Sequence, residues 1–116
     1  MAFYTWLKCE GAREKRTLVE SSATGWWYTS ALPDRTRVVA FHTDADRVSE
    51  IRHSNLGWNQ HLNSTVHLRK IIAGAQVLHS IQSAEACGAR LDKFAGDNWL
   101  AVGDAALSFD PLSLQG

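Results

Sequence analysis

The stretch that decides the fold class lies at the end of the chain and reads Asn98-Trp99-Leu100-Ala101-Val102-Gly103-Asp104-Ala105-Ala106-Leu107-Ser108-Phe109-Asp110-Pro111-Leu112-Ser113-Leu114-Gln115-Gly116. Its apolar start predicts a short buried strand over residues 99–102, and this strand leads into Gly-Asp. A carboxylate at the C-terminal end of a strand lies where nucleotide ligands bind in layered α/β folds. Pro111 suits the first turn of a helix, so we expect a helix to begin near Leu112 and to direct its free N–H groups at an anionic group.

The first part of the chain is rich in residues that favour strands. We expect strands over residues 2–8, 16–22, 25–32 and 37–43, which contain many aromatic and β-branched residues. The connection over residues 33–36 has the length of a hairpin loop, so the strands on either side of it should pair antiparallel. Four strands with short links predict an antiparallel meander that leaves one face to be covered.

The middle of the chain changes to a helical pattern. Thr43 or Asp44 can cap a helix, and apolar residues then recur at helical spacing from Trp58 to Gly74. Asn63-Ser64-Thr65 interrupts this stretch with a second capping sequence, which predicts two short helices rather than one. Short extended segments should follow over residues 77–81 and 84–91. Together these features predict an α+β fold, with an antiparallel sheet, short helices and one returning strand.

Composition and charge narrow the function classes. The 116 residues suffice for one domain at most, and 12 basic and 12 acidic side chains cancel. Zero net charge argues against nucleic acid as a partner. The two cysteines are far apart in sequence, and the spacing of the five histidines does not suit a metal pair, so we expect free thiols, a cytoplasmic location and no metal. No apolar run approaches the roughly 20 residues of a membrane helix.

Two segments carry a resemblance to a known family. The Val102-Gly103-Asp104-Ala105-Ala106 sequence, followed by Asp110-Pro111 and Gln115-Gly116, resembles the second FAD-contacting segment of flavoprotein monooxygenases of the p-hydroxybenzoate hydroxylase type. The stretches 25–33 and 38–46 resemble the substrate-domain strand pair of the tryptophan halogenase-like branch of that superfamily. Within this branch the chain looks most like the flavoproteins that accompany quinoprotein lysine oxidases.

The resemblance implies a cofactor and the residues that would hold it. Asp104 corresponds to the aspartate that contacts the ribityl chain of FAD, and Gly103, Ala105, Pro111, Gln115 and Gly116 would line the flavin through backbone groups. Residues 1–85 would form part of the substrate domain and residues 86–116 part of the FAD-binding domain. The family's reaction also implies NAD(P)H or a reduced flavin as electron donor.

On the substrate side, the family's sheet forms a wall over the reactive side of the flavin. We expect Trp27 and Phe41 on this wall to face a small-molecule or peptidyl substrate. Halogenases carry a Trp-x-Trp-x-Ile-Pro motif here, and this chain has Tyr28 and Ser30 at the two tryptophan positions. Hydroxylation, halogenation and other flavin-dependent oxidations therefore all remain open, and no catalytic residue is assigned.

The resemblance covers only part of a flavoenzyme. The first flavin-binding segment, a strand followed by Gly-x-Gly-x-x-Gly, is absent from the sequence. The sequence thus predicts a fragment of an FAD-dependent oxidoreductase that is inactive alone and that associates with a complementary flavoprotein segment or with itself. The alternative is a non-catalytic module that kept the fold and binds a protein partner or a small apolar ligand through its Trp-rich sheet.

Overall fold

The computed structural model describes residues 1–10, 14–52, 55–109 and 111–113. The chain divides into two compact units, Met1–Ala84 and Glu85–Gly116, which are described separately below. The assignment of these units to a substrate domain and an FAD-binding domain stays a prediction.

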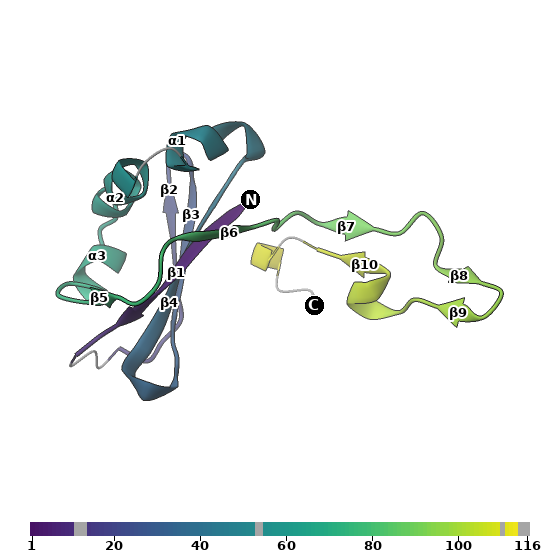
Figure 1. Cartoon of the computed structure of the whole chain (residues 1–116), viewed down its shortest axis with the longest axis horizontal. Helices are drawn as coiled ribbons and strands as arrows, with labels where there is room; N and C mark the ends of the chain where they lie inside the picture. The colour runs from purple at the N-terminus through teal and green to yellow at the C-terminus, as the bar shows by residue number, and fades with distance from the viewer. Residues whose placement is uncertain (11–13, 53–54, 110, 114–116) are drawn as a thin grey trace. The chain divides into compact units, whose positions relative to one another are not determined.

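The first unit is built on an antiparallel sheet (Figure 1). Its long strands lie in the order β2-β3-β4-β1, with bounds β1 (Ala2–Lys8), β2 (Leu18–Ser22), β3 (Gly25–Ala31) and β4 (Thr36–Thr43). Two short strands, β5 (Gln76–Val77) and β6 (Gln82–Ala84), both pair with the remaining edge of β1. The predicted antiparallel sheet of an α+β fold is confirmed.

The hairpin predicted at residues 33–36 is observed between β3 and β4. The 3₁₀ turn η1 (Pro33–Arg35) connects the two strands, and the Leu32 N–H donates to the Thr36 carbonyl at 2.9 Å. Asp34 has φ 61° and Arg35 has φ 59°, a left-handed conformation that aspartate tolerates better than most residues. The turn sets the register in which Trp27 lies opposite Phe41 and Trp26 lies opposite His42.

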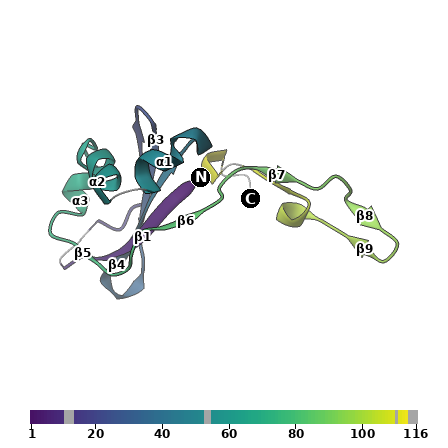
Figure 2. The same cartoon turned by 45° about the horizontal axis from the view of Figure 1, so that its top comes forward.

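Three short helices follow the sheet in sequence and cover one side of it (Figure 2). They are α1 (Val48–Arg52), α2 (Asn55–Asn63) and α3 (Leu68–Ile71), and the 3₁₀ turn η2 (Ala45–Arg47) leads into α1. The two helices predicted for the Trp58 to Gly74 stretch are therefore confirmed as α2 and α3. Among the described residues, no helix is long and apolar enough to cross a membrane.

The core lies between the sheet and these helices. Side chains on a strand alternate between its two faces, so every second residue of β1, β3 and β4 turns toward the helices. The buried cluster comprises Phe3, Leu7, Cys9, Trp27, Val39 and Phe41 from the sheet side and Ile51, Trp58 and Leu68 from the helices. The single tryptophan of α2, Trp58, meets Trp27 edge-on with ring centroids 4.8 Å apart. The hydrophobic core therefore lies on the face of the sheet that the helices cover.

The second unit consists of short paired strands and turns. β7 (Ala89–Arg90) pairs with β10 (Leu107–Ser108), and β8 (Ala95–Gly96) pairs with β9 (Trp99–Leu100), all antiparallel. The expected strand over 99–102 is thus present only at Trp99–Leu100, and the expectation that it is buried is wrong. Leu100 is 71% exposed because no apolar layer covers it within the described part of this unit.

Candidate functional site

The Gly-Asp-Ala sequence forms a tight turn in the second unit. Gly103, Asp104 and Ala105 make the 3₁₀ turn η3 (Gly103–Ala105), which the Ala106 N–H closes by donating to the Gly103 carbonyl at 2.9 Å. Gly103 has φ 58°, a left-handed conformation that disfavours any residue with a Cβ. No neighbouring atom lies within 4 Å of the position that a Cβ on Gly103 would occupy.

This turn presents a carboxylate and open backbone to solvent. Asp104 and Ala105 are exposed, and the space beside Gly103 allows another molecule to approach the main chain closely. A carboxylate can accept hydrogen bonds from sugar-like hydroxyl groups, as the ribityl contact of a flavin requires. The residues present at this turn therefore fit the part of the flavin site expected of them.

Near Leu112, where a helix is expected, the described residues form only a 3₁₀ turn, so the helix itself stays a prediction. Pro111 begins the 3₁₀ turn η4 (Pro111–Ser113), consistent with its fixed φ and missing N–H. Asp110, Gln115 and Gly116 lie outside the described residues, so their predicted roles beside the flavin stay predictions.

The two residues expected to face substrate lie instead in the core. Trp27 is 1% exposed and Phe41 is 0% exposed, with ring centroids 4.6 Å apart beneath the helices. Their side chains have no surface left to offer a ligand. The expectation for Trp27 and Phe41 is therefore corrected: both stabilise the sheet–helix interface, because the helices cover the face on which these two residues lie.

The opposite face of the sheet carries the aromatic residues that sequence reasoning missed. We call the half-buried set Tyr4, Trp6, Trp26, Tyr28 and His42 the aromatic face. Trp26 stacks on His42 with ring centroids 3.8 Å apart and an interplanar angle of 5°. Tyr4 meets Trp6 edge-on at 5.3 Å. These rings come from β4 itself and from the strands on either side of it, β1 and β3.

The register shows how these side chains are arranged. On β4, Ala40 lies opposite Tyr4 of β1 and opposite Tyr28 of β3, so a small residue separates two aromatic ones. One step along the same face, Val38 lies opposite Trp6 of β1 but opposite Ser30 of β3, so an aromatic residue flanks it on one side only. The surface around Ala40 and Val38 is therefore aliphatic with aromatic neighbours, which suits contact with a flat apolar molecule.

Alternation along β3 shows which residues share this face, although it does not show which face the helices cover. Tyr28 and Ser30 occupy the positions of the two tryptophans in the halogenase motif. Residues two apart on a strand share a face, so Trp26 shares the face of Tyr28 and Ser30, while Trp27 does not. A shift of one residue exchanges the two faces of a strand. Trp26, and not Trp27, therefore shares the face of the two motif positions.

Cys9 and the metal-binding residue types are further candidates for parts of a site, within the part of the chain that the structure describes. Cys9 is buried, and burial raises the pKa of its thiol by more than the Arg37 guanidinium lowers it, so Cys9 is a poor nucleophile. Within the described ranges, no three His, Cys, Asp or Glu side chains gather as a metal site would need.

Comparison with known proteins supports the relationship that these features indicate. The chain is 35% identical over 113 residues to LodB of Marinomonas mediterranea, which is named, provisionally, an FAD-dependent oxidoreductase. This match covers 92% of the chain and 30% of LodB. No family model matches the chain.

Solved structures show the same fold. The flavin-dependent halogenase CmlS superposes with a TM-score of 0.83 at 22% identity, over 99% of this chain and 22% of CmlS. The myxobacterial chondrochloren halogenase CndH, an FAD-dependent halogenase, superposes with a TM-score of 0.79 at 17% identity, over 96% of this chain and 28% of CndH.

The fold is thus that of a segment of the flavin-dependent halogenases. The chain is related in sequence to part of an FAD-dependent oxidoreductase, and the resemblance stated from the motifs is confirmed. The chain spans less than a third of the length of each of these proteins.

Proposed function

We propose that this chain is part of an FAD-dependent oxidoreductase and supplies its second flavin-contacting segment and its substrate-facing sheet. The exposed Gly103–Ala105 turn carries the proposal. Its left-handed glycine and free carboxylate are the features that close backbone approach and hydrogen bonding to a ribityl chain require.

Each residue of the segment has a distinct proposed role. The Asp104 carboxylate accepts hydrogen bonds from ribityl hydroxyl groups, while Gly103 and Ala105 keep the main chain free of bulky side chains. Backbone groups of Pro111, Gln115 and Gly116 are proposed to line the flavin ring. FAD, when bound, supplies the electron transfer and the reaction with oxygen, and the chain supplies orientation and polarity. NAD(P)H or a reduced flavin is the proposed electron donor.

The aromatic face replaces Trp27 and Phe41 as the proposed substrate wall. Trp26 and Tyr28 on β3 and Tyr4 and Trp6 on β1 would enclose the apolar part of a small-molecule or peptidyl substrate and exclude water from it. Tyr28 and Ser30 are smaller or more polar than the tryptophans of the halogenase motif. We therefore propose oxygenation or another oxidation of the substrate as the reaction.

The proposed partner is the rest of such a flavoprotein. In the second unit many large apolar side chains are exposed, among them Leu91, Phe94, Trp99, Leu100, Val102, Leu107, Phe109 and Leu112. Exposed apolar groups at this density are typical of a surface that another chain segment covers. Self-association of this chain is the alternative to such a partner. We also propose a cytoplasmic location, with which the free thiols of Cys9 and Cys87 agree.

Titration of the 116-residue chain with FAD tests the flavin contact directly. We expect saturable quenching of flavin fluorescence, with a dissociation constant on the order of micromolar or weaker. Riboflavin should bind as well as FAD, because the proposed contacts reach only the ring and the ribityl chain. Asp104→Asn should weaken binding about tenfold, since a neutral amide oxygen accepts hydrogen bonds from the ribityl hydroxyl groups less strongly than a carboxylate does. Asp97→Asn, at an exposed acid of the same unit, is the matched control.

If the 116-residue chain binds FAD too weakly to measure, a chimaera with LodB tests the same proposal. The matching segment of LodB is replaced by this chain, and flavin content is read from visible absorbance after purification. The proposal is supported if the chimaera retains flavin, if Asp104→Asn lowers the flavin content and if Asp97→Asn leaves it unchanged. A folded chimaera without flavin would contradict it and would favour the non-catalytic binding module.

A further inference from the structure

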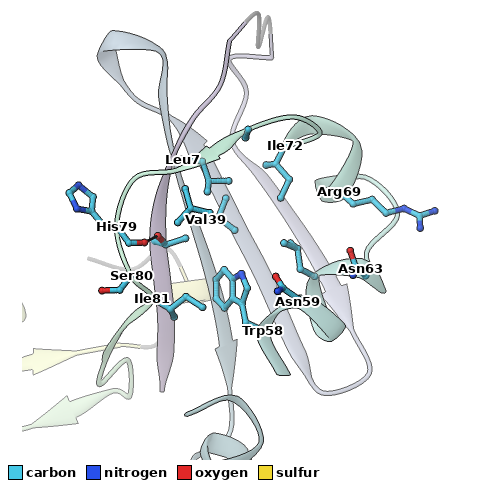
Figure 3. A pocket seen from close by; sticks show the side chains of 14 residues that line it. Leu7, Val39, Trp58, Asn59, Asn63, Arg69, Ile72, His79, Ser80 and Ile81 are labelled. Carbon is cyan, nitrogen blue, oxygen red and sulfur yellow. Dashed lines mark hydrogen bonds between the residues drawn. The ribbon is translucent and has the colours of Figure 1, made fainter. Parts of the chain in front are cut away.

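A cavity of about 450 Å³ opens on the helix side of the sheet, in the first unit (Figure 3). It lies on the face opposite the aromatic face, so it is separate from the proposed substrate wall. Its floor is formed by Thr5 and Leu7 of β1 and Val39 of β4. The other lining residues come from α2, α3 and the segment that follows α3 as far as Ile81.

The body of the cavity is apolar. Leu7, Val39, Trp58, Ile72 and Ile81 turn their side chains toward its centre (Figure 3). The only polar group on the floor is already engaged, because the Thr5 hydroxyl donates to the His79 carbonyl at 2.7 Å. This bond also holds the segment between β5 and β6 against β1 and so closes one wall. A volume of this size falls within the range of small-molecule sites, which is about 300–1,000 Å³.

The mouth of the cavity is polar and carries positive charge. Asn59 and Asn63 are four residues apart on α2 and therefore form a column beside Trp58 and Leu62. Arg69 of α3 lies next to them, with its exposed side chain extending outward in Figure 3. A flexible, exposed arginine can turn across the mouth, and no Asp or Glu is among the lining residues.

We propose that this cavity binds a small apolar molecule with an anionic head group, the head meeting Arg69, Asn59 and Asn63 while the body fills the space above Leu7 and Val39. Apolar walls stabilise the body by removing it from water. Charge complementarity at the mouth selects an anion over a cation. The proposal does not rest on the flavin function, since the residues involved belong neither to the aromatic face nor to the Gly103–Ala105 turn.

The probe for the test is decanoate, added to the 116-residue chain well below the concentration at which it forms micelles. Two-dimensional amide NMR should show saturable shifts at Leu7, Leu62, Ile72 and Ala75. Arg69→Gln should weaken decanoate binding about two- to fivefold, the size typical of an exposed ion pair. Binding of the uncharged analogue 1-decanol should not change, and the cationic analogue decylamine should bind more weakly than decanoate.

Two variants that occlude the cavity provide the second arm. Val77→Trp on β5 and Ala75→Phe should each weaken decanoate about tenfold or more, because at least two ligand methylenes lose their place. The matched control is Val19→Trp, at an exposed valine of edge strand β2 that does not line the cavity. Amide dispersion shows whether each variant is folded, and the shifts of the unmodified chain decide the matter if neither occluding variant folds.

Three results would overturn the proposal. The first is the absence of saturable binding to the folded chain. The second is a shift pattern confined to the aromatic face or to residues 85–116. The third is equal binding of decanoate and decylamine, which would show that the cavity does not select an anionic head group.

Discussion

The carboxylate of Glu20 accepts a hydrogen bond from the backbone N–H of Leu68 at 2.8 Å, which ties edge strand β2 to the start of α3. The same carboxylate accepts N–H bonds from Val66 and His67. The N–H groups of His67 and Leu68 are among those that the start of any helix leaves without an internal partner, and Val66 directly precedes them. A side chain 46 residues away in sequence therefore performs the role of a local helix cap.

The Glu20 contact predicts a pH-dependent stability. Burial alone would raise the pKa of Glu20, but the N–H donors of Leu68, Val66 and His67 lower it overall. A pKa lower in the folded than in the unfolded chain gives stability that is present above the unfolded value of about 4.5 and is lost as pH falls through the folded value. We expect Glu20→Gln to lower the free energy of unfolding by about 1–2 kcal/mol at neutral pH.

Urea unfolding at several pH values measures this effect. The difference between the Glu20→Gln variant and the unmodified chain should shrink as the pH falls below about 4. Glu85→Gln, at an exposed glutamate, is the control and should change little. A difference that stays constant down to strongly acidic pH would show that the carboxylate charge does not matter.

The two neighbouring tryptophans of β3 should differ in how much stability their replacement by alanine removes. Trp27→Ala should cost about 3–5 kcal/mol, because it leaves a cavity beneath Phe41 and Trp58. Trp26→Ala removes a half-buried ring stacked on His42 and should cost about 1 kcal/mol. In the LodB chimaera, Trp26→Ala should impair substrate turnover without loss of flavin. Equal losses of stability for the two variants would contradict the assignment of faces.

The buried guanidinium of Arg37 should add little to stability. Arg37 is 1% exposed; it donates to the Thr29 hydroxyl at 3.2 Å and to the Glu14 carbonyl, while its Nε has no partner among the described residues. Replacing a buried, incompletely paired charge by an apolar side chain of similar size is often neutral or stabilising. We expect Arg37→Met to change the free energy of unfolding by less than about 1 kcal/mol, or to increase it.

Thr29→Val and Arg37→Met together form a double-mutant cycle. Thr29→Val alone should cost about 1–3 kcal/mol, because the Arg37 N–H loses its acceptor and the Val38 carbonyl loses a donor. In the Arg37→Met background the cost should be smaller by at least about 0.5 kcal/mol. Additive effects would mean that the two side chains do not act together.

Two glycines should differ in the reason for their sensitivity to alanine. A Cβ on Gly25 would lie 2.0 Å from the His42 carbonyl oxygen, so Gly25→Ala must push β3 away from β4. We expect a loss of about 3 kcal/mol or more. Gly74 has φ 76° and open space around it, so Gly74→Ala should cost only the left-handed strain of about 1–2 kcal/mol. Thermal unfolding of both variants tests this order, and a larger loss for Gly74→Ala would refute it.

Much of the fold could be read from the chain because it depends on local chemistry. The hairpin at Pro33–Arg35, the antiparallel pairing of β3 with β4 and the break between α2 and α3 each follow from residues close together in sequence. The Gly103–Ala105 turn is local in the same way. The family resemblance rests on these short motifs, and comparison with known proteins confirmed it.

What the tertiary structure alone decided is which face of each strand the helices cover. Trp26 and Trp27 are adjacent and chemically identical, yet one stacks on His42 and the other lies in the core. That difference depends on where α2 packs, which no single strand encodes. The Glu20 cap on α3 and the cavity between α2, α3 and the sheet likewise join segments far apart in sequence. Local propensity determined the elements, and long-range packing determined which side chains they bury and which they leave for ligands.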